Sequence, residues 1–377
     1  MASSASGQVA LPGWIELALL PVFNVGIALL VAGVVVRAIG LDPLQVFGLL
    51  VEGAFGSRAG VSYTLYYATT FVFTGLAVAV AWHAGLFNIG GEGQATMGGL
   101  GAALVGLGLG SQLPAALLLP LMVLSAMLFG LAWAAVPGAL QAWRGSHVVI
   151  TTIMFNFLAA ALIVYLLVGV LKDPAGMAPE SRALGAAAQV PGMHQLLGVL
   201  GLDWPQTPLN ATALLALAAL AGVHVFLWHT RGGYALRATG LAPQAALYGG
   251  IAPRRQVLVA MGLAGALAGL VGINEVAGVH HRLLQDFAAG AGFAGIAVSL
   301  IGRNHPAGIA AAALLFGALH QGGAELVFEV PGFSREMVLT LQGLIVLFAG
   351  AMATVATPLF LRLHALARRA GRSRGAP

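Results

Sequence analysis

One polar segment interrupts two apolar runs of this sequence. It reads GLFNIGGEGQ from Gly85 to Gln94, and its glycines and polar residues cannot continue a regular helix that faces lipid. We expect the chain to break here and a new helix to begin, with Asn88 or a neighbour as its cap and Glu92 near its positive end. Broken helices at membrane depth line a cavity or are buried in protein. The segment is therefore predicted to be a gate or substrate-path element, and the alternative is a short cytoplasmic turn. Its candidate residues are Asn88, Gly90, Gly91, Glu92 and Gln94.

Other polar side chains occur inside apolar stretches. Thr152 and Asn156 are four residues apart and share one helix face. Polar groups within a membrane are costly, so they normally face a bundle interior or a wet path. We assign these polar residues to the substrate path, with interhelical hydrogen bonding as the alternative. Glu275 lies either deep in the membrane or at its outer interface. These candidates are Thr151, Thr152, Asn156, Asn274 and Glu275.

Several kinds of chemistry lack the residues that they require. The chain has no cysteine, which excludes disulfides and thiolate chemistry. His280 and His281 are adjacent and point apart on a helix, so we predict no metal site. The single lysine, Lys172, lies in no P-loop motif, so another subunit must hydrolyse any ATP that drives this protein. We expect no catalytic residue and no cofactor bound by this chain.

The composition indicates that lipid is the main solvent. Of 377 residues, 59% are hydrophobic and 8% are charged, whereas a soluble domain carries about 25% charged residues. A helical membrane span needs about 20 mostly apolar residues. The net charge of +5 is scattered along membrane edges, so we expect contacts with lipid and no binding of nucleic acid.

The apolar runs predict an all-α polytopic membrane protein with about ten transmembrane helices, some broken or re-entrant. We expect one transmembrane domain over 15–361, preceded by a cytoplasmic segment over 1–14 and followed by a basic cytoplasmic tail over 362–377. The short, Gly-rich run at 287–302 is expected to be partial or re-entrant. The predicted spans are 15–36, 63–81, 94–111, 114–140, 147–171, 210–230, 256–278, 287–302, 306–323 and 337–361.

The cations predict the orientation of the chain. With both termini in the cytoplasm, eleven arginines lie inside, and five arginines and Lys172 lie outside. This topology makes 172–209 an external loop and 231–255 a cytoplasmic loop.

Four stretches together resemble the permease subunits of the branched-chain amino acid, ribose and nucleoside class of bacterial ABC importers, closest to the nucleoside or simple-sugar permeases. They occur in the expected order between residues 85 and 319. They are GLFNIGGEGQ at 85–94, VVITTIMFNFLA at 148–159, GYALRATGLAPQAALYGGI at 233–251 and GFAGIAVSLIGRNHPAGIAAAALLFGAL at 292–319.

The resemblance implies a subunit of the bacterial inner membrane that works with ATPase subunits, which bind ATP and Mg. It also implies a second permease, either similar or identical, and an external substrate-binding lipoprotein. In this family the loop that matches 233–251 carries a coupling helix that docks on the ATPase. The residues implied for coupling are Ala235, Leu236, Arg237, Ala238, Gly240, Pro243, Ala245, Ala246 and Leu247.

The predicted function is import of a nucleoside or related simple sugar by alternating access. Such solutes are uncharged and rich in hydroxyls, so a path of Asn, Gln, Thr and Gly with few charges suits them. The first alternative is an ion-coupled secondary transporter of a small polar solute, in which Glu92 or Glu275 carries protons. An intramembrane enzyme is the second alternative, and no paired carboxylates or nucleophile motif favour it.

Overall fold

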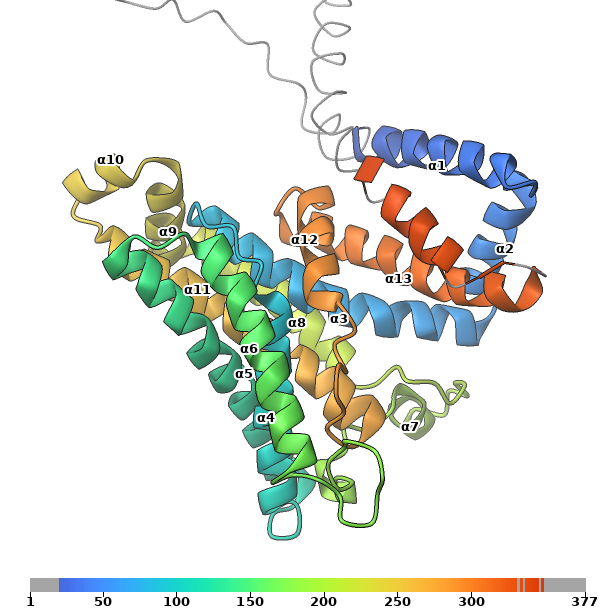
Figure 1. Cartoon of the computed structure of the whole chain (residues 1–377), viewed down its shortest axis with the longest axis horizontal. Helices are drawn as coiled ribbons and strands as arrows, with labels where there is room; N and C mark the ends of the chain where they lie inside the picture. Colours follow the sequence, from blue (N-terminus) through green and yellow to red (C-terminus); the bar gives the residue numbers. More distant parts are fainter. Residues whose placement is uncertain (1–19, 331–332, 335, 346, 349–377) are drawn as a thin grey trace, which may run out of the picture. The chain divides into compact units, whose positions relative to one another are not determined.

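The computed structural model describes residues 20–330, 333–334, 336–345 and 347–348 (Figure 1). The described residues form helices and no β-strand, apart from three isolated β-bridges. The chain divides into two compact units, 50–322 and 1–49 with 323–377. Unit 50–322 contains every residue of the candidate site.

The described elements follow one another along the chain, with the longest connections before and after α7. They are α1 (Leu20–Ala38), α2 (Pro43–Phe55), α3 (Arg58–His83), α4 (Gly91–Leu109), α5 (Ala115–Ala139) with its π-helical continuation η2 (Leu140–Arg144), α6 (Val148–Val168), the 3-10 helix η3 (Ala186–Ala188), α7 (Met193–Val199), α8 (Thr212–His229), α9 (Arg231–Leu241), α10 (Pro243–Tyr248), α11 (Pro253–Gly269), the π-helix η4 (Ile273–His280), α12 (Ala291–Ile301) and α13 (Pro306–Glu329). A further described helical stretch covers 336–345.

Within the described residues, six helices are long and apolar enough to cross a membrane, or up to seven if the bent pair of α1 and α2 is one span. The axes of that pair, taken over Gly26–Ala38 and Pro43–Phe55, bend by 120°. The chain is therefore a multi-pass membrane protein. About ten spans stays a prediction, because α4 and α12 are not among the six and part of 337–361 lies outside the described residues.

Helices α3 and α11 form the centre of unit 50–322. In the most apolar 18-residue stretch of each span, 83% of the residues are buried for Arg58–His83 and 72% for Pro253–His280. The buried share is 28% for Ala115–Arg144, 28% for Val148–Val168 and 22% for Thr212–His229. The outer helices expose large aliphatic and aromatic side chains such as Leu128 and Phe157. Such an exterior suits lipid, whose tails solvate apolar groups on every side.

Small residues allow the central helices to approach closely. A Cβ atom on Gly265 of α11 would lie 2.2 Å from the carbonyl oxygen of Gly130 in α5, and one on Gly98 of α4 would lie 2.3 Å from the Cα of Gly269. Helices already in lipid associate through this kind of close packing, because apolar burial drives little association there. These contacts join α4, α5 and α11 into one packed group.

Two ends of unit 50–322 can be distinguished by their contacts. At one end, which we call the α7 end, Ser62 near the start of α3 lies 2.5 Å from the hydroxyl of Thr207. At the other end, which we call the α9 end, the ring of His83 at the close of α3 packs on Trp228, 5.4 Å away. Figure 1 shows α9 and α10 far from α7. Helix α3 thus crosses the whole unit.

Two helices begin inside the unit. Helix α4 starts at Gly91 after a non-helical stretch at 84–90, which confirms the predicted break. Helix α12 has 11 residues, so it is about 16 Å long and cannot cross a bilayer core of about 30 Å. This confirms that the run at 287–302 holds only a partial helix. The starts of α4 and α12 touch, because a Cβ atom on Gly292 would lie 2.1 Å from the backbone nitrogen of Glu92.

Candidate functional site

The break before α4 is braced by side chains of α6. The amide of Asn156 accepts a hydrogen bond from the backbone N–H of Gly93 and donates one to the carbonyl of Ile89, both at 2.9 Å. One turn earlier, Thr152 Oγ1 accepts from the N–H of Ile89 at 3.3 Å. The predicted polar face of Thr152 and Asn156 therefore lies directly against the break.

The predicted cap of α4, Asn88 or a neighbour, is confirmed in position but makes no side-chain bond to the first turn. The N-cap residue is Gly90, and neither it nor Asn88 supplies a side-chain cap to the first turn. Instead, the N–H of Gly93, which has no partner within its own helix, donates to Asn156 of a neighbouring helix. Since any buried acceptor can pair an N–H at a helix start, a partner from another helix makes a local cap unnecessary.

Asn88 and Gln94 form a buried amide pair across the break. Asn88 Nδ2 donates to Gln94 Oε1 at 3.0 Å, and Gln94 Nε2 donates to Asn88 Oδ1 at 3.1 Å. Asn88 Oδ1 also accepts from the N–H of Gly90 at 2.9 Å. Each side chain is 1% exposed. The pair holds the turn that starts α4.

Glu92 connects the starts of the two half-helices. Its Oε1 accepts from the N–H of Gly290 at 2.9 Å, and its Oε2 accepts from the N–H of Gly292 at 2.8 Å. Helix N-termini carry partial positive charge and unpaired N–H groups. One carboxylate thus lies in the first turn of α4 and caps α12 as well.

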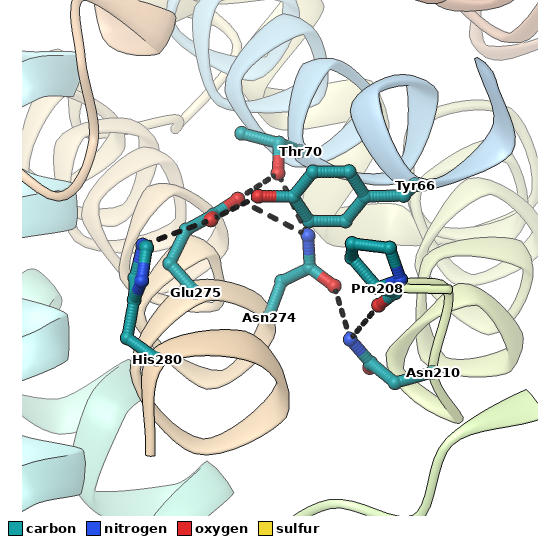
Figure 2. A network of polar contacts seen from close by, with 7 residues as sticks. All are labelled: Tyr66, Thr70, Pro208, Asn210, Asn274, Glu275 and His280. Atoms are coloured by element: carbon teal, nitrogen blue, oxygen red, sulfur yellow. Dashed lines mark hydrogen bonds and ion pairs between the residues drawn. The ribbon is translucent and has the colours of Figure 1, made fainter. Parts of the chain in front are cut away.

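A second polar network surrounds Glu275, nearer the α7 end (Figure 2). Tyr66 Oη donates to Glu275 Oε2 at 2.5 Å, and Thr70 Oγ1 donates to Oε1 at 2.7 Å. Asn274 Nδ2 donates to Thr70 Oγ1 at 2.8 Å and to Glu275 Oε1 at 3.2 Å. Glu275 is 5% exposed, so it lies deep in the unit and not at its surface.

Figure 2 shows that the network extends to Asn210, before α8, and to His280, on the same π-helical turn as Glu275. Asn210, just before α8, donates to Asn274 Oδ1 at 3.1 Å and to the carbonyl of Pro208 at 3.0 Å. His280 Nε2 lies 4.0 Å from Glu275 Oε2. The π-helical turn η4 carries Asn274, Glu275 and His280. π-Helical turns are rare in proteins overall, but those that occur are often found at functional sites.

The structure separates the predicted path residues into two groups. Seven lie at the α4 break, and Asn274 and Glu275 lie in the second network. Thr151 belongs to neither group, because its hydroxyl bonds to carbonyls of its own helix at His147 and Val148. Tyr66, Thr70 and Asn210 are not among the residues predicted from the sequence. Tyr66 and Thr70 belong to a series spaced four apart along one helix, which is a usable signal: Ser62, Tyr66, Thr70 and Thr74.

The predicted coupling loop forms the helical hairpin α9–α10. Thr230 caps α9 by accepting from the N–H of Gly233 at 3.1 Å, and Arg237 Nε donates to the carbonyl of Leu227 in α8 at 3.0 Å. Leu236 and Ala246 are buried and anchor the hairpin to the unit. Ala245 is exposed, and Ala235, Ala238 and Gly240 are half-buried.

The tip of this hairpin presents apolar side chains outward. Leu241 is 88% exposed, Leu247 57% and Tyr248 93%. Pro243 at the start of α10 is exposed as well. We call Leu241, Leu247 and Tyr248 the hairpin rim. Exposed apolar surface of this kind marks a contact with another protein or with the membrane.

The family of the chain follows from comparison with known proteins. Residues 60–350 match the family described as branched-chain amino acid transport system / permease component. The chain belongs to this permease family. The match includes the α4 break, both polar networks and the α9–α10 hairpin, which are thus parts of a transport protein and not of an enzyme.

Curated relatives cover most of the permease. The glucose ABC transporter permease protein TsgB13 of Haloferax volcanii is 35% identical over 89% of this chain and 88% of its own. The guanosine ABC transporter permease protein NupP of Bacillus subtilis is 32% identical over 88% and 93%. The nucleoside ABC transporter permease protein NupB of Lactococcus lactis is 31% identical over 88% and 90%. The chain is the permease subunit of an ABC importer.

Amides, hydroxyls and backbone N–H groups dominate both networks. Within the described residues, no three His, Asp or Glu side chains are placed to hold a metal ion. The two networks instead supply amides and hydroxyls around two carboxylates, each with both oxygens accepting hydrogen bonds. They position helices in the state seen here.

Proposed function

We propose that this permease imports a nucleoside or a related simple sugar by alternating access. The observation that carries the proposal is the hairpin rim of α9–α10, an exposed apolar surface on a hairpin that is bonded to α8. The relatives named for guanosine, nucleosides and glucose support the solute class. Amides and hydroxyls inside the permease match solutes that carry hydroxyls and no charge.

The rim is the docking surface for the ATPase subunit. In this proposal Pro243, Ala245, Leu247 and Tyr248 contact the ATPase, while Leu236 and Ala246 transmit its motion into the unit. ATP and Mg are bound by the partner, and this chain binds no cofactor. A coupling element of this kind must make different contacts in the two states of the transporter.

The same proposal places the α9 end in the cytoplasm and the α7 end outside the inner membrane of a bacterium. The loop 172–209 then meets an external substrate-binding lipoprotein, and the path forms with a second permease, either a homologue or a second copy. Both termini are assigned to the cytoplasm. Motion at the junction of α4 and α12, where Glu92 bonds to Gly290 and Gly292, opens or closes the path.

Uptake by the complete importer tests the solute class. Proteoliposomes that contain the permease, its ATPase, its second permease and its binding protein should accumulate radiolabelled guanosine or glucose only with internal ATP and Mg. Unlabelled cargo should compete, and branched-chain amino acids should not. Uptake of a branched-chain amino acid in preference to both labelled solutes would overturn the proposed cargo.

A pair of tyrosine variants tests the coupling assignment. Tyr248→Ala removes a rim side chain that is 93% exposed, and Tyr165→Ala removes an outward side chain of α6 that is 69% exposed. We expect Tyr248→Ala to lose cargo-stimulated ATPase activity by about tenfold, as for the truncation of an aromatic interface anchor. Tyr165→Ala should retain it, and equal activity of the two variants would remove the assignment.

The ion-coupled alternative is disfavoured by family membership and by geometry. Both oxygens of Glu92 and of Glu275 accept hydrogen bonds, so neither carboxylate is an open proton acceptor in this state. Uptake driven by a proton or sodium gradient in the absence of ATP would support the alternative instead.

A further inference from the structure

A cavity of about 490 Å³ opens at the α9 end of unit 50–322. Its walls come from the ends of α3 and α8, the stretch before α4, helix α9 and the turn between α12 and α13. Figure 1 shows α8 and α9 beside α3 in this unit. Its volume lies in the range of small-molecule sites, about 300–1,000 Å³. Apart from Leu241 of the hairpin rim, its lining residues have no role in the transport steps proposed above.

Two arginines give this cavity a positive wall. Arg237 and Arg303 line it, and no carboxylate is among the lining residues. Arg237 is held in place by the bond from its Nε to the carbonyl of Leu227. Arg303 is exposed and lies in a left-handed turn with φ of 56°. Guanidinium groups match phosphate oxygens in geometry as well as in charge.

Aromatic rings form most of the apolar wall. The aromatic lining residues are Trp82, Phe87 and Trp228, and the aliphatic ones are Leu86 and Leu241. The rings of Trp82 and Phe87 meet edge to face at 6.1 Å. The ring of Trp228 is stacked on His224, with the ring centroids 5.2 Å apart. Rigid rings of this kind bind planar bases by stacking.

We propose that this cavity binds a nucleotide, with its phosphate against Arg237 and Arg303 and its base among Trp82, Phe87 and Trp228. A purine or pyrimidine monophosphate combines the two features that the walls recognise. A phospholipid headgroup shares the phosphate, but the rings favour a planar base over acyl chains. A free nucleoside lacks the charge that the arginines select.

The position of the cavity gives the bound nucleotide a means to regulate transport. Gly240 of α9 packs on the end of α3 so closely that a Cβ atom there would lie 2.3 Å from the carbonyl oxygen of His83. The nucleotide would bridge α9 and the stretch before α4, and would hold the α9–α10 hairpin in one position. This regulatory step rests on the proposed coupling role of the hairpin, whereas the binding itself does not.

Calorimetry on the full-length permease tests the binding. In phosphatidylcholine nanodiscs, guanosine monophosphate should bind saturably and guanosine about tenfold or more weakly, because the nucleoside forms no charged pair with arginine. Arg303→Asn removes one cation and introduces a residue that tolerates the left-handed turn. It should weaken binding by about tenfold, as expected for loss of a charge-assisted contact.

Matched controls keep this test decisive. Arg254→Asn removes an exposed arginine of α11 that does not line the cavity, and it should bind like the wild type. If Arg303→Asn does not fold, Trp82→Leu, which replaces a ring that is 46% exposed, should show the same weakening. Equal binding of guanosine and its monophosphate, no binding, or wild-type affinity in a folded cavity variant would overturn the proposal.

Two further arms separate the sources of phosphate and the two proposals. If phosphatidylglycerol in the nanodisc competes with guanosine monophosphate, the site binds a lipid headgroup, and the nucleotide proposal is overturned. The calorimetry needs neither cargo nor ATPase, so its failure leaves the transport function untouched. Conversely, absent uptake with intact nucleotide binding counts against the transport function alone. In the complete importer, saturating guanosine monophosphate should lower uptake by the wild type and not by Arg303→Asn.

Discussion

Glu92 Oε2 accepts a hydrogen bond from the backbone N–H of Gly292, 2.8 Å away and 200 positions later in the chain. Through this bond and its partner at Gly290, one carboxylate joins the starts of α4 and α12. Both helices begin inside the unit, so their positive ends meet at the same carboxylate. This junction gives the first prediction.

Replacement of Glu92 should loosen the junction. Glu92→Ala leaves the N–H groups of Gly290 and Gly292 without their acceptor, and unpaired buried groups cost about 1–3 kcal/mol each. Glu92→Gln retains one acceptor oxygen and should cost less. Thermal unfolding in detergent measures the effect. Thr96→Ala is the control, because its hydroxyl bonds only to the carbonyl of Glu92 in its own helix. Equal stability of Glu92→Ala and Thr96→Ala would contradict the role.

Adjacent threonines on α6 should differ in their effect. Thr152→Val removes the acceptor for the N–H of Ile89, whereas Thr151→Val removes only bonds to backbone of its own helix. We expect a loss of about 1 kcal/mol for Thr152→Val and a loss near zero for Thr151→Val. Chemical unfolding in mixed micelles compares the two. A larger loss for Thr151→Val would mean that the brace at the break is misassigned.

The Tyr66–Glu275 bond should show energetic coupling. In a double-mutant cycle, Tyr66→Phe and Glu275→Gln should be coupled by about 1.5–3 kcal/mol, as for hydrogen bonds to charged groups. The unfolding free energies of the four proteins give the coupling term. The pair Tyr63→Phe with Glu275→Gln serves as the control cycle. Additive effects in the Tyr66 cycle would show that the 2.5 Å contact contributes little.

The glycine at the contact between α9 and α3 should not tolerate a methyl group. A Cβ atom on Gly240 would meet backbone atoms of His83 and Gly85, which cannot move aside as a flexible side chain can. Gly240→Ala should therefore lower stability by about 1–3 kcal/mol, as in other overpacked sites. At Gly249 of the same hairpin the nearest atom would lie at 3.4 Å, so Gly249→Ala is the matched control. Similar melting temperatures for both variants would refute the prediction.

Acid should destabilise the α9 end through His305. Burial lowers the pKa of His305, and electrostatic interaction with the nearby His224 and His83 lowers it further. An unfolded histidine has a pKa of about 6.5, so the unfolded state takes up more protons as the pH falls below that value. The contribution of neutral His305 to folding stability is therefore fully present above this pH. It is lost progressively as the pH falls towards the lowered pKa. Melting curves between pH 8 and about 5 should show a shallower decrease for His305→Asn than for the wild type, and identical slopes would contradict this cause.

The sequence determined the features that depend on local composition. Apolar runs of sufficient length predicted the membrane spans, since hydrocarbon excludes unpaired backbone at any position along the chain. The glycines and polar residues at 85–94 predicted the break, because no lipid-facing helix continues through them. The spacing of Thr152 and Asn156 placed both on one face, because that follows from the helical repeat alone.

Only the tertiary structure decided which groups meet. The N–H of Gly93 in the first turn of α4 donates to Asn156 of another helix, because a buried N–H pairs with whichever acceptor packing brings within reach. Tyr66 and Glu275 are 209 positions apart, and their contact depends on how α3 packs on α11 and η4. The π-helical turn that carries Asn274 and Glu275 has no local signature. Hydrogen bonds act over about 3 Å, so their partners are fixed by packing between helices and not by order along the chain.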